Sequence, residues 1–258
     1  LCDRLEDYLG VASGAEEIRS SRSQLAQIAT AHGQGLRGAV HALALLNDDQ
    51  LSDAELDLVE DIATKLGDNV LLKAVLERRV RESADPKQQV ECLGRLAALA
   101  ERSGEPKVAI EKLKQGADIA KGMGDDHAAI TMLERVRSIT PKDQAATTQL
   151  VELLERTGSW ERVPSLLSVL LELAADTEAR VALLRRLSST LANQLNDPSR
   201  AFDAARSAFS LSPASREVLA ELADLAERAE RTEDFATAIG EALATIGNDS
   251  TDSTWAEL

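Results

Sequence analysis

The chain has 258 residues, of which 44% are hydrophobic and 2% aromatic, and it carries a net charge of -15. Such an acidic chain excludes nucleic acid and an anionic membrane surface as main partners, because binding either one requires positive charge. No apolar run approaches the roughly 18 residues of a membrane-spanning helix. With so few aromatic residues, the core must consist of Leu, Ala, Val and Ile, which favours close-packed helices over strands.

Apolar residues recur at steps of three and four along most of the chain, which is the spacing of one buried helix face. This spacing and the turn residues between segments predict an all-α fold of about 13 to 14 helices. The expected helices are 15–32, 35–46, 52–66, 69–83, 86–103, 106–122, 125–139, 142–157, 160–174, 177–195, 198–211, 214–230 and 233–246, with a further short one at 2–9.

Turn signals divide the chain at regular intervals, so we interpret it as an internal repeat. Five of the six intervals lie between 34 and 38 residues, the length of two helices and two turns, and one interval is 20 residues. The turn signals are Gly33-Gln34, Gly67-Asp68, Gly104-Glu105, Gly124-Asp125, Gly158-Ser159, Asn196-Asp197 and Thr232-Glu233.

The residues between these turns repeat as well. First helices carry the ladders Leu113-Gly116-Ala117-Ala120, Leu150-Val151-Leu154 and Leu222-Leu225-Ala226-Ala229, and second helices carry Ala129-Leu133-Val136 and Ala201-Ala205-Ala208. This pattern resembles the tetratricopeptide (TPR) repeat family, more clearly over 105–247 than over 15–104. Trp160 and Phe235 stand where the family places an aromatic residue, whereas Leu113, Leu222 and Ala229 replace its usual aromatics. The resemblance implies a right-handed superhelical solenoid of antiparallel helix pairs, and we expect one repeat domain over 1–258.

The short interval between Gly104 and Gly124 predicts a phase slip in the repeat. The helix at 106–122 fits equally as the second helix of the Gly104 pair and as the first helix of the Gly124 pair. Because each helix of a solenoid contacts only its near neighbours, the array can absorb such a shift.

Prolines and capping residues agree with these boundaries. Five of the six prolines follow a polar residue suited to a helix start, as in Thr140-Pro141 and Ser212-Pro213. Ser52-Asp53-Ala54-Glu55 is a capping-box sequence. Pro164 lies a few residues into its segment, which predicts that this helix starts late or bends.

Both ends of the sequence suggest a longer protein. The first residue is Leu, so the native start is missing, and Trp255 and Leu258 fit the beginning of a further first helix, a truncated repeat at 252–258. Cys2 and Cys92 have neither metal-ligand spacing nor a disulfide framework, which favours free thiols in a reducing cytoplasm.

The sequence contains no motif that predicts catalysis, a metal or a cofactor. His32, His41 and His127 lack a completing ligand set, and Asn47-Asp48-Asp49 lacks the spacing of a calcium loop. The glycines of 33–38 follow no strand, as a phosphate loop would require. Ser165, Ser188 and Ser189 lie outside any nucleophile-elbow context. We therefore expect a protein that is not an enzyme.

Two basic clusters, Arg78-Arg79 with Arg81 and Arg185-Arg186, lie among glutamates on predicted helices. A solvated ion-pair face and an anchor for an acidic peptide both fit this pattern.

The resemblance to TPR repeats implies that first helices line a concave, partner-binding face. The residues expected there, outside the core, are Glu91, Glu101, Lys114, Asp118, Lys121, Thr148, Glu152, Glu155, Arg186, Thr190, Glu227 and Glu230. This set is mainly acidic, with basic positions at Lys114, Lys121 and Arg186, so the expected partner is a basic or amphipathic protein or peptide. The predicted function is a protein-interaction scaffold. The alternative is a structural or sensory repeat segment that packs on neighbouring domains of a larger regulatory protein.

Overall fold

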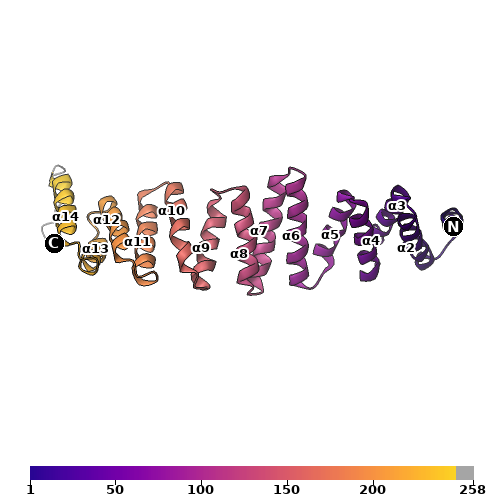
Figure 1. Ribbon diagram of the computed structural model, residues 1–258, viewed down its shortest axis with the longest axis horizontal. Coiled ribbons are helices and arrows are strands. Elements are labelled where there is room, and N and C mark those ends of the chain that lie inside the picture. The colour runs from indigo at the N-terminus through magenta and orange to yellow at the C-terminus, as the bar shows by residue number, and fades with distance from the viewer. Residues whose placement is uncertain (248–258) are drawn as a thin grey trace. The chain divides into compact units, whose positions relative to one another are not determined.

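The computed structural model describes residues 1–247, and within them the fold is all-α, as the sequence predicts. The chain divides into two compact units, 1–132 and 133–258, which are described separately. The first unit contains α1 (Cys2–Leu9), α2 (Ala15–Ala31), α3 (Gly35–Leu46), α4 (Asp53–Leu66), α5 (Asn69–Glu82), α6 (Pro86–Arg102) and α7 (Pro106–Gly122) (Figure 1).

The unit boundary lies inside α8 (Asp126–Ile139). The second unit continues with α9 (Gln144–Arg156), the 3₁₀ turn η1 (Trp160–Arg162), α10 (Val163–Leu173), α11 (Thr177–Asn193), α12 (Pro198–Leu211), α13 (Arg216–Arg228) and α14 (Thr232–Gly247). The start of α10 after a 3₁₀ turn confirms the late start predicted from Pro164. None of the helices within 1–247 is both long and apolar enough to cross a membrane. The predicted repeat at 252–258 lies outside the described residues, and the single repeat domain over 1–258 stays a prediction.

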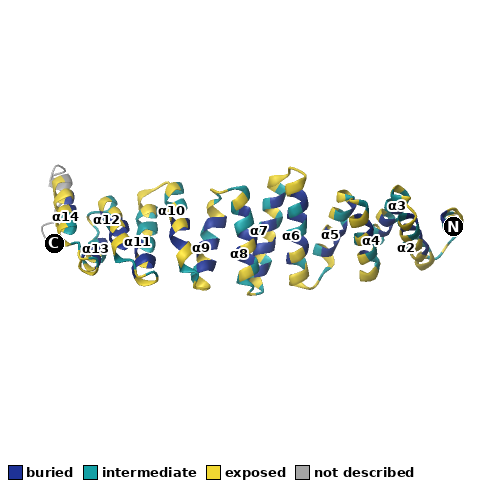
Figure 2. Ribbon diagram, viewed as in Figure 1, coloured by how far each residue is buried: buried dark blue, intermediate teal, exposed yellow. Residues whose placement is uncertain are grey.

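In both units consecutive helices bury the apolar stripes that they turn toward each other (Figure 2). At the start of α3 in the first unit, Gly38 lies so close to α2 that an added Cβ would be 3.1 Å from the Ala26 carbonyl oxygen. Small residues at such positions let two helix backbones approach closely, which is how a core made of Leu and Ala is packed.

The tight turns between paired helices share one backbone geometry. Seven residues among those described have a positive φ: the glycines at 33, 67, 104, 124 and 158, with φ between 65° and 77°, and two non-glycine residues, Asn196 and Glu230. Past the left-handed residue, the next N–H donates to a carbonyl five residues back in six of these turns, as from Gln34 to Ala29 at 2.8 Å and from Asp68 to Ala63 at 2.9 Å, and six residues back in the turn at Asn196. This is the Schellman pattern, which ends a helix and reverses the chain.

The last tight turn departs from the sequence prediction. The expected turn signal is Thr232-Glu233, but Thr232 begins α14, and the left-handed residue is Glu230 with φ 55°. Arg231 N–H donates to the Ala226 carbonyl at 2.8 Å, so the turn has the same hydrogen bond as the glycine turns. Because the Cβ of Glu disfavours this conformation, the residue type at position 230 does not predict a turn.

Tight left-handed turns precede α3, α5, α7, α8, η1, α12 and α14, whereas the other helix connections after α2 lack a left-handed residue. Only α7 therefore has such a turn at both ends among the described helices, which places the phase slip where the sequence predicts it. An added Cβ on Gly116 would lie 3.6 Å from Leu93 of α6 and 3.6 Å from Met132 of α8. The helix thus packs on both of its neighbours.

Capping side chains explain where several helices begin. The capping box at Ser52 is present, with Ser52 N–H donating to the Glu55 carboxylate at 2.9 Å. Two predicted starts are corrected. The helices expected at 142 and 214 begin at Gln144 and Arg216, since Asp143 accepts from Ala146 N–H and Ser215 accepts from Val218 N–H. The preceding prolines therefore lie in the turns.

Helix α1 is held on the first unit by an ion cluster as well as by apolar contacts. Cys2 packs against Leu25 and Ala29 of α2. From α3, Arg37 pairs with Asp3 at 2.6 Å and with Glu6, and His41 lies 3.0 Å from Glu6. Hydrogen bonds from Arg37, and then from His41, lower the pKa of Glu6 from its ordinary 4.5 to about 2.

Replacing Glu230 with Gly is expected to stabilise the chain by about 1 kcal/mol, because Gly adopts the left-handed conformation without a Cβ clash. The matched control, Glu227→Gly inside α13, is expected to destabilise by about 1 kcal/mol. Urea unfolding followed by circular dichroism measures both changes. A loss of stability in Glu230→Gly would contradict the turn assignment.

The pKa of Glu6 also predicts an acid-sensitive attachment of α1. Because the folded-state value is lowered, the contribution of Glu6 is complete above about pH 4.5 and disappears as the pH falls toward 2. The protection factors of the α1 amides, which are exchange rates corrected for the intrinsic rate at each pH, should therefore fall across this window in the parent chain. In Glu6→Gln they should be low already at pH 5 and change less on acidification, whereas identical profiles would refute the role of this carboxylate.

Candidate protein-binding face

The predicted partner-binding residues fall into two sets, one in each unit. In the second unit Glu152 and Glu227 are exposed on α9 and α13, and Glu230 is exposed just past the end of α13. Glu155 and Thr148 are half-buried on α9. These positions belong to the first helices of their pairs, α9, α11 and α13.

Thr190 of α11 is buried, although its sequence position predicts that it lies on the surface. Its residue is 5% exposed, and its hydroxyl donates to the Arg186 carbonyl at 2.9 Å. The hydroxyl is therefore hydrogen-bonded within its own helix, and Thr190 is buried where a partner would not contact it.

Two neighbouring arginines of α11 connect the first helices of the second unit. Arg186 makes a two-point contact with Glu155 of α9, at 2.9 and 2.6 Å. Arg185 makes a two-point contact with Glu221 of α13, through Nε at 3.0 Å and Nη2 at 2.6 Å. Since successive helix residues point about 100° apart, one arginine reaches toward each neighbouring helix. Such paired contacts fix the orientation of the planar guanidinium groups.

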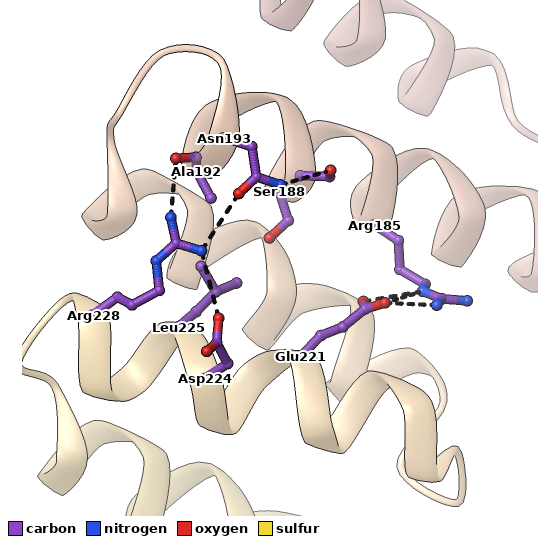
Figure 3. A pocket seen from close by; sticks show the side chains of 9 residues that line it. Arg185, Ser188, Ala192, Asn193, Glu221, Asp224, Leu225 and Arg228 are labelled. Carbon is purple, nitrogen blue, oxygen red and sulfur yellow. Dashed lines mark hydrogen bonds and ion pairs between the residues drawn. The ribbon is translucent and has the colours of Figure 1, made fainter.

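A cavity of about 200 Å³ lies between α11 and α13 beside these contacts. Figure 3 shows the Arg185–Glu221 pair at one end and Arg228 at the other. Arg228 reaches the Ala192 carbonyl at 3.1 Å and the Asp224 carboxylate at 3.4 Å. The cavity is lined by Arg185, Ser188, Ser189, Ala192, Asn193, Glu221, Asp224, Leu225 and Arg228.

These ion pairs decide the electrostatics of the face. Hydrogen bonding to Glu221 raises the pKa of Arg185, and hydrogen bonding to Glu155 raises the pKa of Arg186. Both guanidinium groups thus stay charged, but each is neutralised by its own carboxylate. The Arg185-Arg186 cluster is therefore an ion-pair bridge between helices, and the outward charge of the face comes from carboxylates such as Glu152 and Glu227.

In the first unit the predicted residues lie on two helices of one pair. Glu91 and Glu101 are exposed on α6, and Asp118 is exposed on α7. Lys114 and Lys121 of α7 are half-buried, and Lys121 Nζ lies 3.0 Å from the Asp118 carboxylate. At least one of the basic positions expected as anchors, Lys121, therefore has an acidic neighbour.

The basic cluster at Arg78-Arg79 differs from the solvated face expected from its sequence. Arg78 is 5% exposed and donates to the Leu46 carbonyl at 2.7 Å, and Arg79 is 9% exposed. Glu60 of α4 pairs with Arg79 of α5 at 2.8 Å and with Arg95 of α6 at 2.5 Å. These arginines join α5 to α3 and α4, and α6 to α4. Their partners on other helices lie nineteen or more positions away, so the local sequence contains no signal for their burial.

Metal-ligating side chains do not gather in the part of the chain that is described. No three His, Cys, Asp or Glu residues within 1–247 are grouped so as to hold a metal ion. Cys2 and Cys92 are both buried and unbonded, and burial raises the pKa of the Cys92 thiol. A thiol held in its neutral form is a poor nucleophile.

No protein-family model matches the sequence, and no curated protein matches it. Among solved structures, MamA 41-end from Desulfovibrio magneticus RS-1 is 18% identical and covers 72% of this chain and 99% of its own, with a TM-score of 0.38. Another MamA crystal structure is 11% identical over 72% of this chain and 97% of its own, with a TM-score of 0.40. BtubC (BKLC) from P. vanneervenii is 14% identical over 93% of this chain and 94% of its own, with a TM-score of 0.31.

Because these TM-scores are low, the similarities say nothing about the site. The described part of the chain is by its own helices and turns an all-α helical-repeat protein. Its antiparallel pairs are joined by left-handed turns, and the repeat pattern is similar to that of TPR proteins.

The bridge between α9 and α11 is expected to couple Glu155 and Arg186 energetically. In a double-mutant cycle with Glu155→Gln and Arg186→Met, the coupling energy should be about 1 kcal/mol, because the contact is two-pointed and partly shielded. The control pair Lys142–Glu172 is a single contact at 3.2 Å between exposed side chains and should couple by less than about 0.5 kcal/mol. Equal coupling in both cycles would contradict the bridge.

Proposed function

We propose that this protein is an interaction scaffold that binds another protein through the face formed by α9, α11 and α13. The observation that carries the proposal is the arginine bridge of α11. Arg186 holds α9 and Arg185 holds α13 through two-point contacts. The three helices are thereby fixed side by side before a partner arrives, and a preformed surface loses little entropy on binding.

The charge of this face indicates the chemistry of the partner. With the arginines neutralised by their own glutamates, the exposed carboxylates of Glu152 and Glu227 set the sign of the face. Opposite charge steers association and favours the correct partner. The proposed partner is therefore a basic or amphipathic protein segment, and an amphipathic helix laid along the face is the favoured mode.

We further propose membership of the TPR family for the repeats and a single repeat domain for the whole chain. The alternation of left-handed turns with connections that lack a left-handed residue supports the first proposal, and the recurrence of these turns in both units supports the second. A protein-binding role is in keeping with repeat arrays, whose extended surfaces are suited to it.

A second candidate function is a repeat segment that packs on a neighbouring domain of a larger protein. An exposed aliphatic stripe on α3 favours it, with Leu36 89%, Val40 65% and Leu43 49% exposed. These residues follow one another at four and three positions, so they share one side of the helix. Apolar residues gathered on one exposed face indicate an interaction surface.

The proposed function is tested by affinity capture from a lysate of the source organism, with quantitative mass spectrometry. A specific partner should be captured by the parent chain and reduced at least about tenfold by Glu152→Lys combined with Glu227→Lys, because the face then repels basic groups. The control combines Glu172→Lys on α10 with Glu233→Lys on α14, which changes the net charge equally on second helices. Equal capture by all three proteins would refute the proposed face.

A further inference from the structure

A second groove lies in the second unit, between the second helices α10 and α12. It has a volume of about 740 Å³, within the range of pockets that bury a ligand. Its floor is made by Leu184, Leu187, Leu191 and Leu195, from α11 and the turn after it. Its walls are Pro164, Ser165 and Ser168 on one side and Ala204 and Ser207 on the other.

The floor of this groove is an incompletely covered part of the core. Leu184 and Leu187 pack against the apolar cluster of the unit, but each remains partly exposed. The neighbouring first helix α9 differs, because its Leu150, Val151 and Leu154 are fully buried. Leaving aliphatic area in water costs roughly 25 cal/mol for each Å², so covering these leucines with a ligand makes the free energy of binding more favourable.

The serine hydroxyl groups on the walls already donate hydrogen bonds to backbone carbonyls. Ser165 donates to the Arg162 carbonyl, Ser168 to the Pro164 carbonyl and Ser207 to the Asp203 carbonyl, all within one helical turn. An apolar side chain that enters the groove therefore leaves no hydroxyl donor unpaired, and the desolvation penalty for a lost hydrogen bond does not arise.

The charges that line the groove sum to a negative edge. Arg200 pairs with Asp197 at 3.6 Å, and Asp203 pairs with Arg231 at 2.5 Å. Glu161 of η1 also lines the groove and makes no ion pair with the described residues. A cation placed beside Glu161 thus completes the charge balance.

We propose that this groove is a second docking surface, which receives an amphipathic helix of a partner protein. Aliphatic side chains of that helix cover Leu184 and Leu187, and a Lys or Arg at its edge pairs with Glu161. The negative edge disfavours a second copy of this chain as occupant, because each copy carries a net charge of -15 and the two repel. The surface is separate from the face of α9, α11 and α13.

The test uses a fluorescein-labelled Leu/Lys amphipathic peptide of about five helical turns and its Leu/Glu counterpart as probes. Fluorescence anisotropy should show that the parent chain binds the Leu/Lys peptide at least about tenfold more tightly than the Leu/Glu peptide. Ser168→Trp and Ser207→Trp, both at exposed wall positions, should each fill the groove and weaken binding about tenfold. Circular dichroism checks that both variants keep their helix content.

Two matched controls separate the groove from other surfaces and from general charge attraction. Ser189→Trp places the same side chain in the α11–α13 cavity and should leave peptide binding unchanged. Glu161→Lys should weaken binding at least about threefold more than Glu178→Lys, although both change the net charge equally and both residues are exposed.

Four results would overturn the proposal. They are no binding of the Leu/Lys peptide, equal binding by the parent and Ser168→Trp, equal weakening by Ser189→Trp, and self-association of the chain that Ser168→Trp abolishes, which would make a second copy the occupant. Failure of the α9–α11–α13 face is detected separately, through capture by the Glu152→Lys and Glu227→Lys variant.

Discussion

The left-handed residue at the end of a helix is the constraint on which the rest of this fold depends. At Gly67, for example, the chain turns so sharply that the Asp68 N–H bonds back to the Ala63 carbonyl, and the same Asp68 then caps the next helix. Asp68 thus takes part in the end of one helix and in the start of the next. No linker remains that would let the second helix take another direction. The two helices must run antiparallel with their apolar stripes facing, and this arrangement recurs in both units.

Paired helices of this kind bring distant polar residues together, and those residues then fix the surface. Arg185 and Arg186 are adjacent in sequence, yet they contact helices on opposite sides of α11, at Glu221 and Glu155. The same principle operates in the first unit, where Glu60 joins arginines of two later helices. Because the arginines are neutralised within these bridges, exposed carboxylates such as Glu152 and Glu227 give the face its charge. A rigid acidic face of this kind suits the basic partner segment that we propose.

Much of the fold was predictable because its determinants are local. Glycine and asparagine at the turns, the capping box at Ser52 and the position of Pro164 each act within a few residues, so the helices and the phase slip at α7 follow from the sequence. Glu230 was not predictable, since its conformation is imposed by the turn against its own preference.

The surface was less predictable than the fold for a related reason. The burial of Arg78 and Thr190, and the exposure of Leu184 and Leu187, depend on how neighbouring helices approach. A periodic pattern identifies which residues share a helix face, but it does not determine how completely the next repeat covers that face. The candidate residues of the second unit lie on the helices that the sequence predicts, apart from Glu230, which lies past the end of α13, and their pairing is visible only in the structure.

The most direct test of this account is hydrogen–deuterium exchange of the chain with and without a captured partner. We expect binding to slow exchange in α9, α11 and α13 together, because Arg185 and Arg186 bridge these helices. Protection confined to helices outside this group, with α9 and α13 unchanged, would contradict the proposed face and assign partner binding to another surface.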